Sequence, residues 1–197
     1  MTHWTHTRCS SIAAGARFLT LLVGLQVATV SAAETKVAVV FSGGHETEQK
    51  DGGRPVVLIA AALEVKPEVF RKVFSGVTPA RNGGPSPEQA RSNKAALMKV
   101  LRPLGVTNER LDEVSNYYRY RPQRGELWTV TAAKGHAVVE NGKIKKIVIT
   151  DAGSGYSSAP TISVAGFEKA EFAATVHFDK DLKKNGSISS VKVAAPE

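Results

Sequence analysis

The spacing of apolar residues changes at Trp128, and this change limits the possible fold more than any other feature of the sequence. Before it, apolar side chains recur at helical spacing, as in Val69, Phe70, Val73 and Phe74. After it, short β-branched runs are separated by Gly, Asn and Asp, which is typical of strands and turns. Helices followed by strands predict an α+β fold rather than alternating α/β layers.

Capping and helix-starting residues place about four helices in the first part. Pro55 and Pro67 stand where a helix tolerates proline, at its first position. Ser86 and Gln89 have the spacing of a capping box, and Thr107 is expected to cap the fourth helix. A short strand at 36–41 precedes these helices. The third helix and the turn after it are expected to face the core through Ala90, Leu97, Val100, Leu101 and Leu104.

The second part is predicted to be a small antiparallel β-sandwich or barrel-like module. Asn141-Gly142 between two apolar runs is a strong hairpin signal, because both residues tolerate positive φ. The predicted division is therefore a signal peptide at 1–33, a helical domain at 34–128 and an antiparallel β module at 129–197. Its candidate strands are 136–140, 143–150, 160–165, 171–178 and 187–193.

The β module contains an internal repeat. The pattern N-G-x-I-x-x-[IV]-x-[IV] occurs at 141–149 and again at 185–193. Strict alternation along a strand would place Ile144 and Ile147 on opposite faces of the sheet. Because both copies break the alternation at the same place, we expect a shared bulge that returns the two side chains to one face. The copies predict two related hairpins that pack together.

The first 33 residues predict a cleavable secretory signal peptide. They hold two arginines and no acid, followed by an apolar run at 18–30. That run is shorter than the ~20 residues a spanning helix needs, although an uncleaved anchor is the alternative. Small side chains at 30–33 allow cleavage after Ala32 or Ala33. The expected location is secreted, periplasmic or in the cell envelope, with no transmembrane segment after cleavage.

Cleavage would leave a basic domain without cysteine. The single cysteine, Cys9, lies in the signal segment, so the exported part has no disulfide, thiolate metal site or cysteine nucleophile. Loss of two arginines lowers the net charge from +8 to +6. Outside the cytoplasm the expected partners are a cell-envelope polymer or protein, with no specific nucleic acid. Plain solubility is the alternative, and the oligomeric state is not predicted.

The stretch 147–164, IVITDAGSGYSSAPTISV, holds the pattern G-S-G-Y-x-S-x-P between two apolar runs. It resembles a short β module of bacterial surface proteins and phage tail proteins. The resemblance implies a structural or adhesive role and no known chemistry. The helical part, from Gly44 to Trp128, looks like an uncharacterised family of exported bacterial proteins with the same two-part layout. This second resemblance covers nearly the whole exported chain and implies no activity and no functional residues.

The segment 43–52, here called the polar loop, is the strongest candidate for a metal-binding or catalytic site. Its imidazole and carboxylates could hold a divalent cation, the one cofactor considered, or supply a general base. The alternative is a solvated loop in which Asp51 caps the helix after Pro55 or pairs with Arg54. The candidate site residues are His45, Glu46, Glu48 and Asp51.

A second candidate interleaves aromatic and guanidinium side chains, which can stack on sugar rings or bind acidic glycans. Its residues are Tyr117, Arg119, Tyr120, Arg121, Arg124 and, from the β module, Tyr156. The alternative is packing, with Trp128 filling the junction of the two parts. No complete catalytic set is present. The favoured function is a non-catalytic interaction or structural protein that binds anionic or glycan surfaces, and the alternative is a metal-dependent hydrolase using the polar loop.

Overall fold

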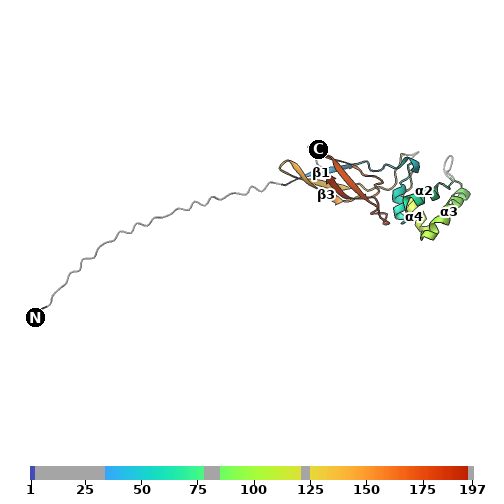
Figure 1. Cartoon of the computed structure of the whole chain (residues 1–197), viewed down its shortest axis with the longest axis horizontal. Coiled ribbons are helices and arrows are strands. Elements are labelled where there is room, and N and C mark those ends of the chain that lie inside the picture. Colours follow the sequence, from blue (N-terminus) through green and yellow to red (C-terminus); the bar gives the residue numbers. More distant parts are fainter. Residues whose placement is uncertain (3–33, 78–84, 121–124, 195–197) are drawn as a thin grey trace. The chain divides into compact units, whose positions relative to one another are not determined.

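The computed structural model describes residues 1–2, 34–77, 85–120 and 125–194, and residues from Ala32 onward form one compact unit. Apart from Met1 and Thr2, the predicted signal peptide lies outside the described residues. The described residues form an α+β fold with four α-helices and two antiparallel sheets (Figure 1). The elements in chain order are β1 Thr35–Ser42, η1 Gln49–Asp51, α1 Val56–Ala62, α2 Pro67–Phe74, α3 Pro87–Leu101, η2 Arg102–Leu104, α4 Asn108–Tyr117, β2 Lys134–Glu140, β3 Lys143–Asp151, β4 Thr161–Val164, β5 Phe172–His177 and β6 Ser187–Val193.

Helices α2, α3 and α4 begin where the sequence predicts, whereas α1 begins at Val56 and has Pro55 as its N-cap rather than its first residue. The Ser86 hydroxyl accepts a hydrogen bond from the amide of Gln89 at 3.2 Å and caps α3. The Thr107 hydroxyl accepts one from the amide of Arg110 at 3.1 Å and caps α4. Each cap satisfies an amide that has no partner within its own helix. α2 begins at Pro67, as expected for proline at a first helical position.

Strand β1 belongs to the sheet rather than to a helical domain. The four-stranded sheet has the order β3-β2-β1-β4, so β1 pairs with β2 on one side and with β4 on the other. The boundary predicted at 128 would separate β1 from the two strands with which it pairs. The physical reason is that β1 buries Val39 and shields Val37 and Phe41 in the sheet core, which requires neighbours from beyond residue 128.

The β5–β6 hairpin forms a second sheet that packs on the first. Apolar side chains from both sheets share one core, in which Ile162 and Val164 of β4 meet Phe172 and Ala174 of β5. A smaller cluster joins Tyr156 and Ile188 to the same hairpin. In Figure 1 the strands gather at one end of the described unit, and α2, α3 and α4 lie at the other.

Both hairpins break register at equivalent positions. In β2–β3 the partners pass from Val138–Lys146 to Val139–Ile144, so Lys145 is the extra residue. In β5–β6 they pass from Thr175–Ser190 to Val176–Ile188, so Ser189 is the extra residue. Each bulge lies between the two apolar residues that break strict alternation. It therefore returns both to one face, as Ile144 and Ile147 show in the sheet core.

The helices enclose a core of their own, centred on Leu58, Leu101 and Val114, each fully buried. Trp128 and Leu182, from the segments flanking the strands, complete this core. The prediction that Val100 and Leu104 face inward is wrong, because they are 44% and 53% exposed. The buried stripe of α3 runs through Met98 and Leu101 instead, the spacing of one helix face. Ala90, also expected inside, is exposed.

Candidate functional site

The polar loop is held against the G-S-G-Y-x-S-x-P segment. The amides of Ser157 and Ser158 both donate to the carbonyl of Gly44, at 2.9 and 3.2 Å. Gly44 has φ +81°, and a Cβ there would lie 2.6 Å from Cδ1 of Tyr156. A side chain at this position would therefore be strained and would collide with the ring. Glycine is required where the two segments touch.

Glu46 is the loop residue that meets this segment most fully. Its carboxylate accepts a short hydrogen bond from the Ser158 hydroxyl, and its amide donates back to the same oxygen at 3.2 Å. The bond from Ser158 lowers the pKa of Glu46 below its ordinary value. The Ser157 hydroxyl donates to the Glu46 carbonyl at 2.8 Å. These contacts fix both serines and the loop to one another.

Asp51 and Glu48 turn away from Glu46 and bind Arg71 of α2. Nε and Nη2 of Arg71 donate to the two carboxylate oxygens of Asp51 at 2.7 and 2.8 Å. The Asp51 side chain is 3% exposed. Nη2 also donates to Glu48 at 2.7 Å, and the hydrogen bond to Asp51 raises the pKa of Arg71 above its ordinary value. The Arg71–Asp51 contact is a bidentate salt bridge that anchors the loop to α2. Asp51 therefore pairs with Arg71, and Arg54 stacks on the ring of Phe74 at 4.4 Å.

His45 packs as an aromatic side chain. Its ring stacks on Tyr156 with centroids 5.3 Å apart and meets the edge of Trp128 at 6.2 Å. Its buried Nδ1 has no hydrogen-bond partner within the described residues. The four predicted loop residues thus have three different sets of neighbours, and they do not converge. Across the part of the chain that the structure describes, no group of three or more His, Cys, Asp or Glu side chains is placed to hold a metal ion.

A hollow of about 300 Å³ lies beside the loop. Its walls carry the three acids of the loop, Arg54, both serines and the start of α1, but not His45. Glu46 and Glu48 are exposed there, whereas the carboxylate of Asp51 is already neutralised by Arg71. The hollow can hold water or a small polar group. Its lining comprises Glu46, Thr47, Glu48, Asp51, Arg54, Pro55, Val56, Val57, Ser157 and Ser158.

The predicted aromatic and arginine surface does not form as one exposed patch. Tyr120 lies over Gly53, where a Cβ would approach its ring to 2.5 Å, and contacts Trp128 edge-on. Tyr117 is half-buried against Tyr118, with centroids 5.1 Å apart. Arg119 is exposed and bonds the side chain of Asn116. Arg121 and Arg124 lie outside the described residues.

Tyr156 is 2% exposed and cannot belong to a surface. Its hydroxyl accepts from the amide of Ala133 at 3.0 Å, and its own amide donates to the carbonyl of Gly186 at 3.0 Å. The neighbouring Gly155 carbonyl accepts from the indole of Trp128 at 2.8 Å. The motif that suggested an adhesive module thus uses its polar groups to join three segments of the chain.

Asn185 was missed by sequence reasoning, although it is fully buried. Its amide nitrogen donates to the carbonyl of Leu58 in α1 at 2.7 Å, and its side-chain oxygen accepts from the amide of Asp179 at 3.1 Å. The repeat equates Asn185 with Asn141, which lies in an exposed two-residue turn. Asn-Gly signalled a turn in both copies, and nothing in the pattern distinguished the buried copy.

The face of the four-stranded sheet that points away from the β5–β6 hairpin is its outer face. Residues that alternate with the buried set project there. The register places Lys36 and Lys146 directly on either side of Val138, across three adjacent strands. Lys134 precedes this row on β2 and has the same parity as Val138. All three lysines are exposed, and none forms an ion pair with another described residue.

Val138 is only 4% exposed although it projects to the outer face and belongs to none of the three cores. The flanking lysines are directly opposite it in register, where their alkyl stems can cover it and leave the ammonium groups in water. Further along this face, Val40 is 57% exposed. The outer face therefore combines an exposed apolar side chain with lysines that have no ion-pair partner among the described residues.

No protein-family model matches the chain, and no curated protein and no solved structure matches it. Within the described residues, none of the helices has the length and apolar character that crossing a bilayer requires.

Proposed function

We propose that this chain is an exported, non-catalytic interaction protein of the cell envelope or extracellular space, and that it binds anionic polymers through the outer face of its four-stranded sheet. The observation that carries the proposal is the row of Lys36, Val138 and Lys146. Backbone positions two strands apart in a sheet are separated by about 10 Å. Such spacing suits a polymer with repeated negative charges rather than a single small anion.

The charges around this row support the assignment. Lys145, the bulged residue of β3, forms ion pairs with Glu140 at 2.9 Å and Glu34 at 3.4 Å. Lys36 and Lys146 have no such partner among the described residues. Serine and threonine continue the same face towards β4, where Ser163 lies opposite Val40 and Thr161 opposite Ser42. Hydroxyl groups beside cations can bind sugar hydroxyl and sulfate or phosphate oxygens.

The metal-dependent hydrolase is the weaker proposal. It needs the polar loop to present several ligands to one ion, with a position open to substrate. Instead, Asp51 is bound by Arg71, and Glu46 is bound by Ser158. The loop residues hold α2 and the serine segment together, which is a structural task.

The relation between the two hairpins is also part of the proposal. We infer that β2–β3 and β5–β6 are two copies of one unit that pack as a small sandwich. Their bulges, at Lys145 and Ser189, support this inference. The β5–β6 hairpin covers the inner face of the four-stranded sheet, and the outer face is left free for a partner.

Binding to dextran sulfate, with neutral dextran as the comparison, tests the proposed function. The compact unit 32–197 is expected to bind dextran sulfate, and more weakly as salt is added, because exposed charges are screened. Each lysine removed in Lys36→Gln and Lys146→Gln is expected to weaken binding by up to about fivefold. Lys192→Gln on β6 is the matched control, since it removes one charge from an exposed residue outside this face.

Two results would contradict this assignment. One is equal binding of dextran and dextran sulfate, or of neither. The other is an equal loss from Lys192→Gln and Lys36→Gln, which would show that only the net charge matters. Thermal melting of each variant, expected to match the parent, separates lost binding from lost folding.

A further inference from the structure

We propose that the C-terminal half of α3 together with η2 is a second binding surface, which docks on an anionic lipid bilayer. This surface is called the α3–η2 surface, and it is distinct from the outer face of the sheet. Its exposed members are Ala95, Ala96, Lys99, Val100, Arg102, Pro103 and Leu104. The proposal takes its compartment from the proposed function, since a bilayer must be within reach of an exported protein, and takes nothing else from it.

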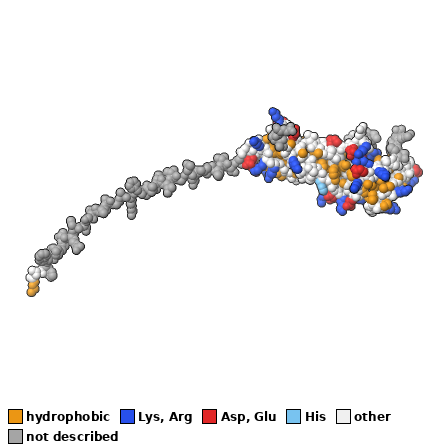
Figure 2. Space-filling view, in the orientation of Figure 1, with side chains coloured by type: hydrophobic (Ala, Val, Ile, Leu, Met, Phe, Trp, Pro, Cys, Tyr) orange, Lys and Arg blue, Asp and Glu red, His pale blue; other side chains and the backbone are white. Residues whose placement is uncertain are grey.

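The first observation is exposed apolar area. Val100 and Leu104 are 44% and 53% exposed, one helical turn apart at positions i and i+4. Sequence patterning alone would bury both, because each continues an apolar run. Figure 2 shows hydrophobic side chains gathered over the helical part of the molecule on the side that is drawn. Two adjacent exposed aliphatic side chains on one turn form a contact patch rather than isolated surface residues.

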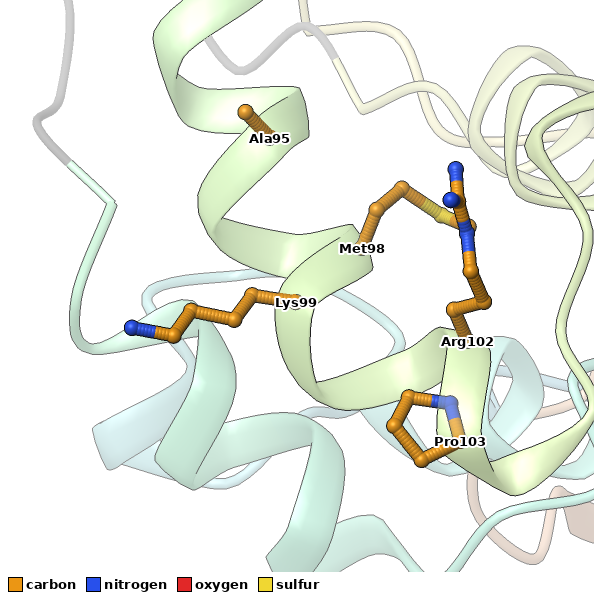
Figure 3. Close-up of a pocket in the computed structure, with 5 residues that line it drawn as sticks. All are labelled: Ala95, Met98, Lys99, Arg102 and Pro103. Carbon is orange, nitrogen blue, oxygen red and sulfur yellow. The ribbon is translucent and has the colours of Figure 1, made fainter.

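The second observation is a hollow of about 460 Å³ on the same stretch of α3. Its lining combines the apolar Ala95, Met98 and Pro103 with the cationic Lys99 and Arg102. Figure 3 shows the two cations extending to opposite sides of the helix, with Met98 beside Arg102 and Pro103 below them. An apolar floor with one cation extending to each side fits the glycerol and acyl region of lipids, whose phosphates would each meet one of the two cations.

The third observation is charge. Neither Lys99 nor Arg102 forms an ion pair with another described residue. The only acid on α3 is Glu88, at its opposite end, where it pairs with Arg91 at 3.0 Å. Lys94 pairs with Asp112 of α4 at 2.6 Å. The two cations without a described ion-pair partner, Lys99 of α3 and Arg102 of η2, thus lie in the same stretch of chain as the exposed Val100 and Leu104.

These three features together favour a bilayer over a protein partner. A protein partner needs a groove of fixed shape to fill, whereas this hollow is lined by only five residues of one helix and the turn after it. Long cationic side chains beside aliphatic ones are the composition of helices that lie in the headgroup region. Each cation near an anionic surface adds attraction that corresponds to about fivefold in affinity. Two cations and two aliphatic side chains suffice for weak, reversible docking.

Site-specific fluorescence tests the orientation. Residues 32–197 contain no cysteine, so one introduced cysteine can carry an environment-sensitive dye at a chosen place. With phosphatidylcholine vesicles that contain phosphatidylglycerol, dye at Leu104→Cys is expected to shift to the blue. Dye at Val193→Cys, an exposed apolar position on β6, is the matched control and is expected to stay unshifted. Vesicles of phosphatidylcholine alone are expected to shift neither.

Vesicle sedimentation tests the energetics. The double variant Lys99→Gln, Arg102→Gln is expected to weaken binding to phosphatidylglycerol vesicles roughly 30-fold, about fivefold for each charge. Val100→Ser with Leu104→Ser is expected to abolish the vesicle binding that remains at high salt, because that binding depends on the aliphatic side chains. The double variant Lys36→Gln, Lys146→Gln is expected to leave vesicle binding unchanged.

No vesicle binding, or a shift at Val193 as large as at Leu104, would overturn this proposal. Equal loss in the α3–η2 and outer-face variants would also overturn it, because a single diffuse charge would then explain the binding. Capture of a protein with no vesicle binding would assign the surface to a different occupant and would likewise reject it. Since dextran sulfate tests the outer face and vesicles test α3–η2, failure of one leaves the other standing.

Discussion

Glu46 contacts two neighbouring serines in different ways, and the difference is measurable. Ser158 donates to its carboxylate, and Ser157 donates to its backbone carbonyl. The first bond depends on ionisation of the carboxylate, and the second does not. The pKa of Glu46 in the folded state is lowered from its ordinary value of 4.5, chiefly by Ser158. A depressed acid stabilises the fold above its unfolded-state pKa and loses that contribution as pH falls through its folded-state pKa.

Ser158→Ala is therefore expected to destabilise the protein more at neutral pH than at low pH. The free energy of unfolding from urea titration should fall by about 1 kcal/mol at pH 7, and the difference from the parent should narrow once the pH drops below 4.5. Ser157→Ala is the matched control and should cost about 1 kcal/mol at every pH. Parallel pH profiles for the two variants would show that the bond to the carboxylate has no ionic character.

The repeat offers a comparison between two glycines at the scale of the hairpin. Gly142 and Gly186 occupy the same position of the N-G pattern and have φ of +73° and +71°. A Cβ at Gly142 would meet nothing within 4 Å. A Cβ at Gly186 would lie 2.6 Å from the carbonyl oxygen of Tyr156 and 2.7 Å from Cδ2 of Leu58. The first glycine is required by backbone conformation alone, and the second also by close packing.

Gly142→Ala is expected to lower the free energy of unfolding by about 1 kcal/mol, the cost of a left-handed alanine. Gly186→Ala should cost about 3 kcal/mol or more, because backbone overlap adds to that strain. Chemical denaturation of the two variants side by side provides the measurement. A similar cost at both sites would mean that the segment 185–186 is not packed against α1 and Tyr156 as described.

Local signals were sufficient to predict the elements but not their neighbours. Ser86, Thr107 and Pro67 act within one turn of chain, so the helix starts follow from the sequence. The break in alternation at Ile144 and Ile147 is equally local, and the bulge lies between them. Pairing of β1 with β2 and β4 joins residues about a hundred positions apart, and no local pattern encodes that choice.

The candidate site could be predicted only in part, for a related reason. The chemistry of Asp51 depends on Arg71 twenty positions later, and that of Glu46 on Ser158. A cluster of polar residues in sequence therefore need not be a cluster in space. The same limit applies to α3, where helical spacing cannot tell which of two apolar stripes, Met98–Leu101 or Val100–Leu104, meets the other helices.

For the molecule as a whole, the helices and sheets are tied together at the loop between β5 and β6. Arg110 of α4 donates to the carbonyl of Ala62 in α1 at 2.9 and 3.2 Å, and also to the carbonyl of Lys180. Asn185 bonds Leu58 from the same loop, and Leu182 enters the helical core. Trp128 also belongs to that core, and its indole N–H donates to the carbonyl of Gly155 in the segment between β3 and β4.

The two parts are consequently expected to unfold in one step. Helical circular dichroism and the hydrogen-exchange protection of the β1 and β2 amides should give superimposable urea curves, which is a test of two-state behaviour. Arg110→Met should lower stability by about 2 kcal/mol, since it leaves carbonyl groups without their charged donor, and should move both curves together. Arg91→Met removes an exposed pair on α3 and should change stability by less than about 0.5 kcal/mol. If the helical signal were lost at lower urea than the protection of the strand amides, the contacts of the β5–β6 loop would be too weak to couple the parts. The helical core would then be an independent folding unit, and the α3–η2 surface could move without the outer face of the sheet.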